Sequence, residues 1–142
     1  MLRYEIEKQL FNGELEVDDL PSTWNSMFKS WFDVEVPEDR LGCLQDIHWS
    51  MGAFGYFPTY TLGNLYAAQL LEAMAADLGN IDDMVASGDW EPMLEWLRPR
   101  IHQRGSQVSP AQLIEDATGA PPSPEPFLRY VERKYGALYQ LG

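Results

Sequence analysis

The feature that most constrains this chain is a long stretch without acidic or basic side chains. Between His48 and Glu72 there is no Asp, Glu, Lys, Arg or His, although Asp and Glu make up 22 of the 142 residues. Segments without charge are usually buried, and Gly52, Gly55 and Pro58 interrupt the first half of this one. The pattern predicts a loop packed inside the protein. Such a loop needs partners for its backbone polar groups, so we expect the functional site here.

Composition narrows the class of protein. A hydrophobic share of 45% is enough for one sizeable core. The net charge of −12 argues against nucleic acid and anionic membranes as partners, because surfaces that bind phosphate need clustered Lys and Arg. The run Trp49–Leu71 is long enough for a membrane span, but glycines and a proline interrupt it, so we expect no membrane segment. The single cysteine, Cys43, excludes an internal disulfide and favours a cytoplasmic location.

The spacing of apolar residues predicts a mainly α fold, an irregular helical array. A long central helix is expected over about Pro58–Leu78, because apolar side chains cover nearly all of its faces until Glu72. At most a short strand pair is expected, near Val34–Val36 and Gly42–Trp49. Shorter helices are predicted over residues 2–11, 21–32 and 125–139, between 80 and 88, between 89 and 105, and after Ser109.

Aromatic residues mark one face of the second predicted helix. Trp24, Met27, Phe28 and Trp31 recur at intervals of three and four residues, which places them on one side of a helix. The favoured interpretation is a stripe that faces the core.

His48 is the one histidine at the edge of the uncharged stretch. In an extended backbone Asp46 and His48 share one side, whereas Gln45 faces the other. An aspartate two residues from a histidine can fix its tautomer through a charge-assisted hydrogen bond. The nearby phenols of Tyr56 and Tyr60 are donors that can stabilise an oxyanion. Each has an ordinary alternative: a structural histidine, and core tyrosines whose hydroxyls are satisfied.

A metal site within this chain is not expected. His48 and His102 are the only histidines and Cys43 is the only thiol, and the sequence contains neither HExxH nor CxxC. A zinc site normally needs three or four protein ligands. The sequence also has no GxSxG motif and no glycine-rich phosphate loop.

The residues around His48 resemble a sequence signature of a known family. GCLQDIHW, residues 42–49, matches the G-x-x-Q-D-x-H-W signature of the thermostable carboxypeptidase Taq family of zinc metallocarboxypeptidases. The resemblance continues through SMGAFGYFPTYTLGNLYAAQL and SPEPFLRYVERKYG, and LRYEIEKQLFNGELEVDDLPSTWN before the signature also resembles that family. It therefore covers essentially the whole chain.

The resemblance implies that this chain is one part of a larger enzyme. Members of that family are long helical chains whose HExxH zinc helix and distal glutamate ligand precede the segment seen here. Residues 1–142 therefore resemble a single helical segment, the C-terminal part of a metallopeptidase catalytic domain. The first predicted helix also begins without a capping residue, which hints that Met1 was once interior to a longer chain. Zinc, or another divalent metal, would bind only in the full-length enzyme, and the chain alone is expected to be inactive.

The resemblance also implies roles for the residues around His48. The enzyme would release C-terminal amino acids from peptides, and this segment would form one wall of the cleft. His48 would donate to the scissile carbonyl or the substrate backbone, Tyr56 or Tyr60 would stabilise the oxyanion, and Asp46 would orient His48. The expected catalytic residues are His48, Tyr60 and Tyr56, and the expected substrate-binding residues are Gln45, Asp46 and Trp49.

The implied partners are peptide C-termini, the missing N-terminal part of the enzyme, and a second copy of the chain. A segment cut from a larger domain should expose apolar surface, so self-association is expected. The alternative function is a non-catalytic acidic helical module that binds a protein partner. A reading frame that continues upstream into HExxH would exclude this alternative.

Overall fold

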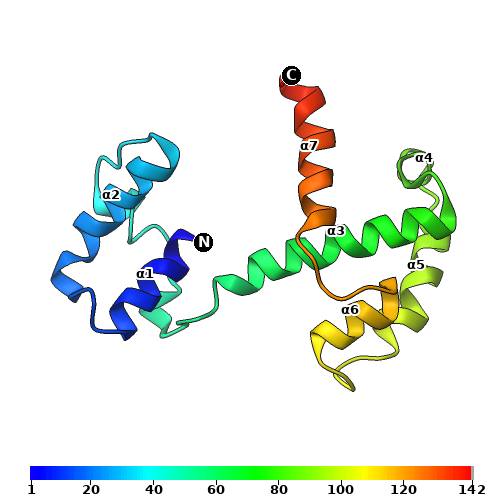
Figure 1. Ribbon diagram of the computed structural model, residues 1–142, viewed down its shortest axis with the longest axis horizontal. Coiled ribbons are helices and arrows are strands. Elements are labelled where there is room, and N and C mark those ends of the chain that lie inside the picture. The colour runs from blue at the N-terminus through cyan, green and yellow to red at the C-terminus, as the bar shows by residue number, and fades with distance from the viewer. Residues whose placement is uncertain (142) are drawn as a thin grey trace. The chain divides into compact units, whose positions relative to one another are not determined.

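The computed structural model describes residues 1–141, which form helices joined by turns (Figure 1). The chain divides into two compact units, Met1–Thr61 and the part from Leu62 onward. Residues 1–141 contain no strand, so the mainly α fold is confirmed. The short strand pair expected near Val34–Val36 and Gly42–Trp49 is wrong.

Local hydrogen bonds explain why Gly42–Trp49 forms turns instead of a strand. The backbone N–H of Gln45 donates to the carbonyl of Gly42 over 3.2 Å, and the N–H of His48 donates to a carboxylate oxygen of Asp46 over 3.2 Å. Backbone groups used in this way are not available to a sheet. The preceding helix ends at Phe32. The next residue, Asp33, has a left-handed backbone conformation with φ of 54°, which changes the direction of the chain just before Val34.

In the first unit two helices pack side by side, α1 (Leu2–Phe11) and α2 (Leu20–Phe32), as Figure 1 shows. Both match their predicted bounds to within one residue. A 3-10 turn, Val17–Asp19, precedes α2. Gly13 follows α1 with φ of +71°, a left-handed conformation that glycine adopts without a steric penalty. The buried core consists of Leu2, Ile6, Trp24 and Cys43.

The aromatic stripe of α2 is buried only at its start. Trp24 is 1% exposed and packs edge-on against Trp49, whereas Trp31 and the neighbouring Phe32 are exposed. Helical spacing placed these rings on one face correctly, but the unit covers only part of that face. Gly42 also belongs to this contact, because a Cβ at position 42 would lie 2.7 Å from Val36 Cγ1 and 3.2 Å from the Trp24 ring.

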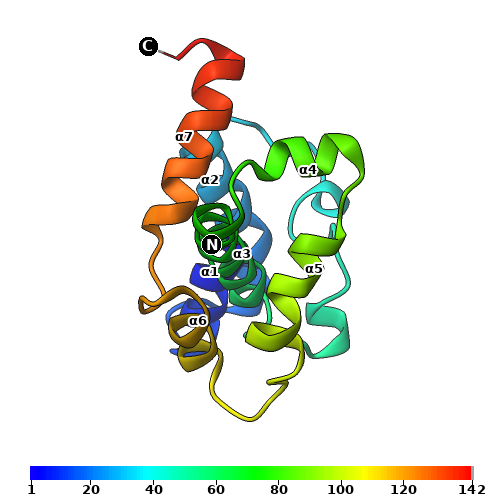
Figure 2. The same cartoon turned by 90° about the vertical axis from the view of Figure 1, so that its right-hand side faces the viewer.

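The second unit is built on α3 (Pro58–Leu78), whose predicted bounds are confirmed. Pro58 opens the helix, where its missing N–H leaves no bond unmade. Only Gln69 and Met74 of this helix are buried, so its apolar faces are covered less than their composition suggested. Figure 2 looks nearly along α3 and shows the later helices arranged around it. These are α4 (Ile81–Ser87), α5 (Glu91–Leu97), a π-helical segment (Arg98–His102), α6 (Pro110–Thr118) and α7 (Glu125–Tyr139).

Side-chain caps and a second core hold these helices. Asn80 Oδ1 accepts the N–H of Asp83 at the start of α4, and Ser109 Oγ accepts that of Gln112 at the start of α6. The core consists of Met74, Ile81 and Trp96. Among residues 1–141, no helix combines the length and the apolar character needed to cross a bilayer.

Gln69 joins α3 to the segment between α6 and α7. Its side-chain N–H groups donate to Thr118 Oγ1 and to the carbonyls of Ala120 and Pro121 over 3.0–3.1 Å. Its carbonyl accepts the backbone N–H of Ser123 over 3.1 Å. The buried amide therefore uses both its donor and its acceptor sides to fix the chain just ahead of α7.

Candidate functional site

The candidate site lies on the motif loop, which we define as residues 42–57 of the first unit. The sequence predicted a buried loop, and this prediction is wrong for the structure described. Ile47 is 65% exposed, Met51 is 71% exposed, and Phe54 and Tyr56 are also exposed. The absence of charged side chains in the part of the loop after His48 therefore does not reflect burial within this unit. Its backbone is held from the side of α1, and many of its apolar side chains face outward.

His48 is the centre of a short chain of hydrogen bonds. Its Nδ1 lies 3.1 Å from Asp46 Oδ1, and its Nε2 lies 3.0 Å from the hydroxyl of Tyr60. The imidazole also stacks on Tyr56 and contacts Phe57, with ring centroids 5.6 Å and 4.7 Å apart. The predicted approach of Asp46 and His48 is observed, although a turn and not an extended backbone produces it.

The carboxylate of Asp46 decides which nitrogen of His48 carries a proton. An ionised carboxylate only accepts hydrogen bonds, so the facing Nδ1 must hold a hydrogen. Neutral His48 then presents a bare Nε2, which accepts the hydroxyl proton of Tyr60. Protonated His48 donates from Nε2 instead, and the hydroxyl of Tyr60 becomes free to donate elsewhere. The protonation state of His48 thus controls the direction of the hydrogen bond at Tyr60.

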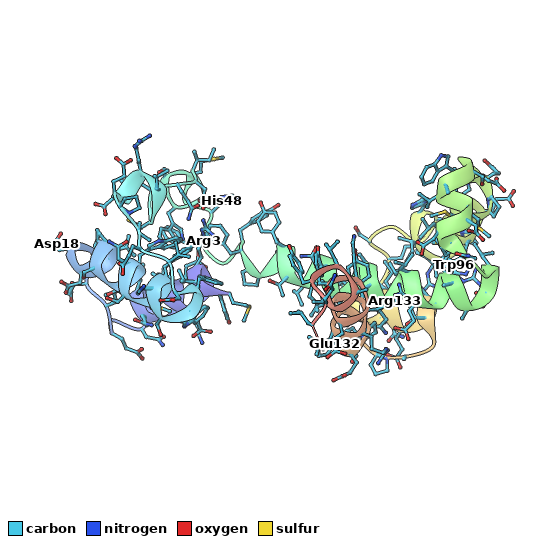
Figure 3. All side chains as sticks on the ribbon, turned by 90° about the horizontal axis from the view of Figure 1, so that it is seen from above. Arg3, Asp18, His48, Trp96, Glu132 and Arg133 are labelled. Atoms are coloured by element: carbon cyan, nitrogen blue, oxygen red, sulfur yellow. The ribbon has the colours of Figure 1, made fainter. Side chains whose placement is uncertain are left out.

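Arg3 holds the other side of the Asp46 carboxylate. Its Nε lies 2.7 Å from Asp46 Oδ2, the oxygen that His48 does not use. Figure 3 labels Arg3 and His48 in the same part of the first unit. Partial burial raises the pKa of Asp46, but the hydrogen bonds from His48 and the charge of Arg3 outweigh this effect and hold the pKa below its ordinary value. Asp46 is therefore ionised at neutral pH.

Glu7 of α1 binds the middle of the motif loop. It is 3% exposed, its Oε1 accepts the indole N–H of Trp49 over 2.8 Å, and its Oε2 accepts the backbone N–H of Gly55 over 3.1 Å. Gly52 and Gly55 have φ of +72° and +75°, which lets the loop curve around this carboxylate. Trp49 is thereby turned toward α1 and α2.

The six residues expected from the sequence do not all share one environment. Asp46, His48, Tyr56 and Tyr60 form one connected group, and the Tyr60 side chain is 53% exposed. Gln45 is exposed on the neighbouring turn. Trp49 is partly buried and packs on Trp24 and Phe57, and its indole N–H donates to Glu7.

No group within residues 1–141 is suited to hold a metal ion, since no three His, Cys, Asp or Glu side chains cluster there. Both ring nitrogens of His48 already have partners. His102 lies on the π-helical segment of the second unit and is exposed. Cys43 is buried, and its burial, together with the charge of Asp39, raises the pKa of the thiol. It belongs to the core.

Arg3 and Glu7 are the site residues that sequence reasoning missed. Glu7 carries a charge, a property typical of the exposed side of a helix, yet it is buried. Arg3 and Glu7 each follow a residue of the buried apolar stripe, Leu2 and Ile6, so they border it. Their opposite charges at a spacing of four residues, beside an apolar stripe, were the available signal.

Comparison with known proteins shows that this chain is similar to metallopeptidases. The sequence profile of the carboxypeptidase Taq (M32) metallopeptidases matches residues 1–135. The chain belongs to this family, as the signature in residues 42–49 predicted. Family membership implies a divalent metal, and it favours the carboxypeptidase interpretation over the acidic interaction module.

Individual relatives agree with the family assignment. "Thermostable carboxypeptidase 1" of Thermus thermophilus is 48% identical over 139 residues, which are 98% of this chain and 27% of that protein. "Carboxypeptidase 1" of Bacillus subtilis is 41% identical over 99% of this chain and 28% of that protein. The crystal structure of the M32 carboxypeptidase from Deinococcus radiodurans R1 matches with a TM-score of 0.93 at 35% identity, over 99% of this chain and 28% of that one. The chain thus spans little more than a quarter of the length of these relatives.

Proposed function

We propose that this chain forms one wall of the substrate cleft in a zinc-dependent carboxypeptidase, which releases C-terminal amino acids from peptides. The observation that supports the proposal is the hydrogen-bonded series Asp46–His48–Tyr60, because His48 is partly exposed on the motif loop and Tyr60, near the start of α3, is 53% exposed. Donors held in advance where a substrate can reach them can stabilise the charge that develops during peptide hydrolysis.

We infer a role for each member of the group from its contacts. Asp46 keeps a hydrogen on Nδ1 of His48 and orients the ring. Protonated His48 donates from Nε2, either to the scissile carbonyl or to the substrate backbone. In that state the hydroxyl of Tyr60 can donate to the oxyanion, and Tyr56, which lies 5.4 Å from Tyr60 between ring centroids, is the second donor. Gln45 and Trp49 shape the wall beside them.

The metal belongs to the rest of the enzyme under this proposal. When bound, zinc supplies a Lewis acid and an activated water for hydrolysis. Residues 1–141 do not offer a suitable set of ligands, so those ligands would come from the remaining length that the relatives possess. Partners of the chain would be peptide C-termini, that remaining part of the same enzyme, and a second copy. The single cysteine favours a cytoplasmic location.

The test compares His48→Ala with His102→Ala in a protein that joins this chain to the remaining length of its relatives. The His48 variant should lose roughly a hundredfold in turnover, the contribution of one oxyanion donor, while exposed His102 serves as the matched control. The chain alone should bind no stoichiometric zinc and release no amino acids. An unchanged rate for His48→Ala, or release of amino acids by the chain alone, would overturn the proposal.

A further inference from the structure

Two oppositely charged side chains of α1, one helical turn apart, both contact the motif loop. Arg3 contacts Asp46, and Glu7 accepts two hydrogen bonds from the loop. Residues four apart lie on one face of a helix, so a single helix face holds the loop at two points. We propose that Arg3 and Glu7 are positioning residues that fix the orientation and hydrogen-bonding state of His48. The proposal rests on the function inferred for His48 above.

The first contact orients the Asp46 carboxylate. One of its oxygens accepts from the backbone N–H and the ring of His48, and the other lies 2.7 Å from Arg3 Nε. The guanidinium is itself fixed, because it lies 4.9 Å from the ring centroids of both Trp24 and Phe57. A carboxylate engaged on both oxygens cannot rotate freely. The acceptor that faces His48 Nδ1 therefore stays in place.

The second contact is that of Glu7, and it fixes both ends of the loop segment 49–55, which lies between His48 and Tyr56. Trp49 directly follows His48, and Gly55 directly precedes Tyr56. Both donate to the same carboxylate of Glu7, one to each oxygen. The imidazole and the first phenol are thereby held at a fixed separation, in the stacked arrangement described above.

The burial of Glu7 argues that this contact has a purpose. Removing a carboxylate from water is costly unless hydrogen bonds replace the lost hydration. Glu7 is 3% exposed, and the described donors to its carboxylate are two neutral N–H groups. An amide or an apolar residue would fill the same place at a lower desolvation cost. A carboxylate is required if both of its oxygens must accept.

The first arm of the test reads the tautomer of His48 by long-range ¹H–¹⁵N correlation at alkaline pH, with exposed His102 in the same spectrum as the reference. Wild-type His48 should carry its hydrogen on Nδ1. Arg3→Met should lower the ratio of the Nδ1–H to the Nε2–H form by about tenfold, as expected for the loss of one charge-assisted contact. Lys8→Met removes a cation from the same helix and should leave the ratio unchanged.

The second arm reads hydrogen exchange at the loop. Glu7→Gln keeps one oxygen for the indole of Trp49 but turns an N–H₂ group toward the N–H of Gly55. Exchange at Gly55 should therefore accelerate by about tenfold or more, whereas the Trp49 indole stays protected. Glu5→Gln, a matched change whose carboxylate pairs with Lys8 at 2.7 Å, should leave both rates unchanged.

The outcomes separate this proposal from the proposed function. A wild-type His48 indistinguishable from His102, or variants of Arg3 and Glu7 that behave like their controls, would overturn the positioning role. In the longer family protein, Arg3→Met should reduce kcat more than it changes KM, because positioning matters most in the transition state. Altered spectra with unchanged kcat would keep the positioning role and remove His48 from catalysis.

Discussion

At the scale of single residues, the Asp46 carboxylate connects the backbone and the ring of His48 to Arg3. It accepts from the backbone and the ring of His48 with one oxygen and pairs with Arg3 through the other. These contacts favour its charged form, and together they hold its pKa below the ordinary value despite partial burial. A depressed pKa in the folded state also means that folding favours the charged form, so Asp46 links stability to pH.

Asp46 should make the first unit more stable at neutral pH than in acid. Well above the ordinary aspartate pKa of about 3.9 the contribution is complete, and it is lost as the pH falls through the lower folded pKa. The free energy of unfolding in urea, followed by tryptophan fluorescence, should be higher for the wild type than for Asp46→Asn at pH 7. The two proteins should converge as the pH falls below the folded pKa of Asp46.

Asp18→Asn is the control for this experiment, because Asp18 lies on an exposed 3-10 turn of the same unit. Its stability curve should run parallel to that of the wild type across the acid range. If the curves of wild type and Asp46→Asn also remain parallel, the contacts of Asp46 with His48 and Arg3 do not contribute to stability.

Sequence reasoning named residues that meet around His48, but it did not predict that Gln45 and Trp49 lie apart from them, or what holds the group. Asp46, His48 and Tyr60 are close together in the structure. Arg3 and Glu7 were missed because their contacts span about 40 residues, and helical periodicity describes only the faces of one helix. A charged residue beside an apolar stripe is usually solvated, so the spacing of Arg3 and Glu7 alone does not predict that Glu7 is buried while its neighbour Lys8 is exposed.

At the scale of elements, α3 and α7 are connected through one side chain. Gln69 binds the segment 118–123 with its donors and its acceptor, and α7 begins only two residues later, at Glu125. The start of α7 is therefore set by an amide on α3 as well as by the apolar contacts between helices.

Gln69→Ala should destabilise the second unit by about 1–3 kcal/mol, because it removes the hydrogen bonds of a buried amide and opens a small cavity. Gln112→Ala is the matched control. Gln112 is exposed on α6 and bonds only to Asp116 through its side chain, so its loss should cost less than about 0.5 kcal/mol. Urea unfolding followed by circular dichroism measures both. Equal losses for the two variants would show that Gln69 does not hold the segment before α7.

Helices were predicted well because their signals are local. Pro58 opens α3 and Ser109 caps α6, each at the position that the sequence indicated. The expected strands failed for a different reason. Within residues 42–49, side chains and turns provide hydrogen-bond partners for the backbone. A prediction based on the alternation of apolar and polar side chains takes no account of such local hydrogen bonds.

At the scale of the whole molecule, a net charge of −12 coexists with exposed apolar side chains. In the first unit these are concentrated on and around the motif loop. Leu41, Leu44, Ile47 and Met51 are each more than half exposed. Apolar surface of this kind usually marks a place where another surface packs, whereas like charges keep copies of the chain apart.

The chain should therefore self-associate, and more strongly as salt is added. Salt screens the repulsion between acidic copies and leaves the apolar attraction in place. Sedimentation velocity at low and high ionic strength measures this effect. Ile47→Glu should reduce association, while Val17→Glu, a change at an equally exposed apolar residue away from the motif loop, should reduce it less. A monomer at every concentration and salt level would contradict the expectation.

The reliance of the motif loop on α1 also determines where a longer relative could be cut into two complementing pieces. A cut in the segment between Phe11 and Leu20 would place Arg3 and Glu7 on one piece and the loop on the other. The loop would then adopt the conformation described above only after the two pieces had associated. A cut ahead of Leu2 would leave the loop and its two anchors on one polypeptide. For a split reporter built on this fold, the first cut gives conditional assembly of the loop, and the second gives a piece with the loop preformed.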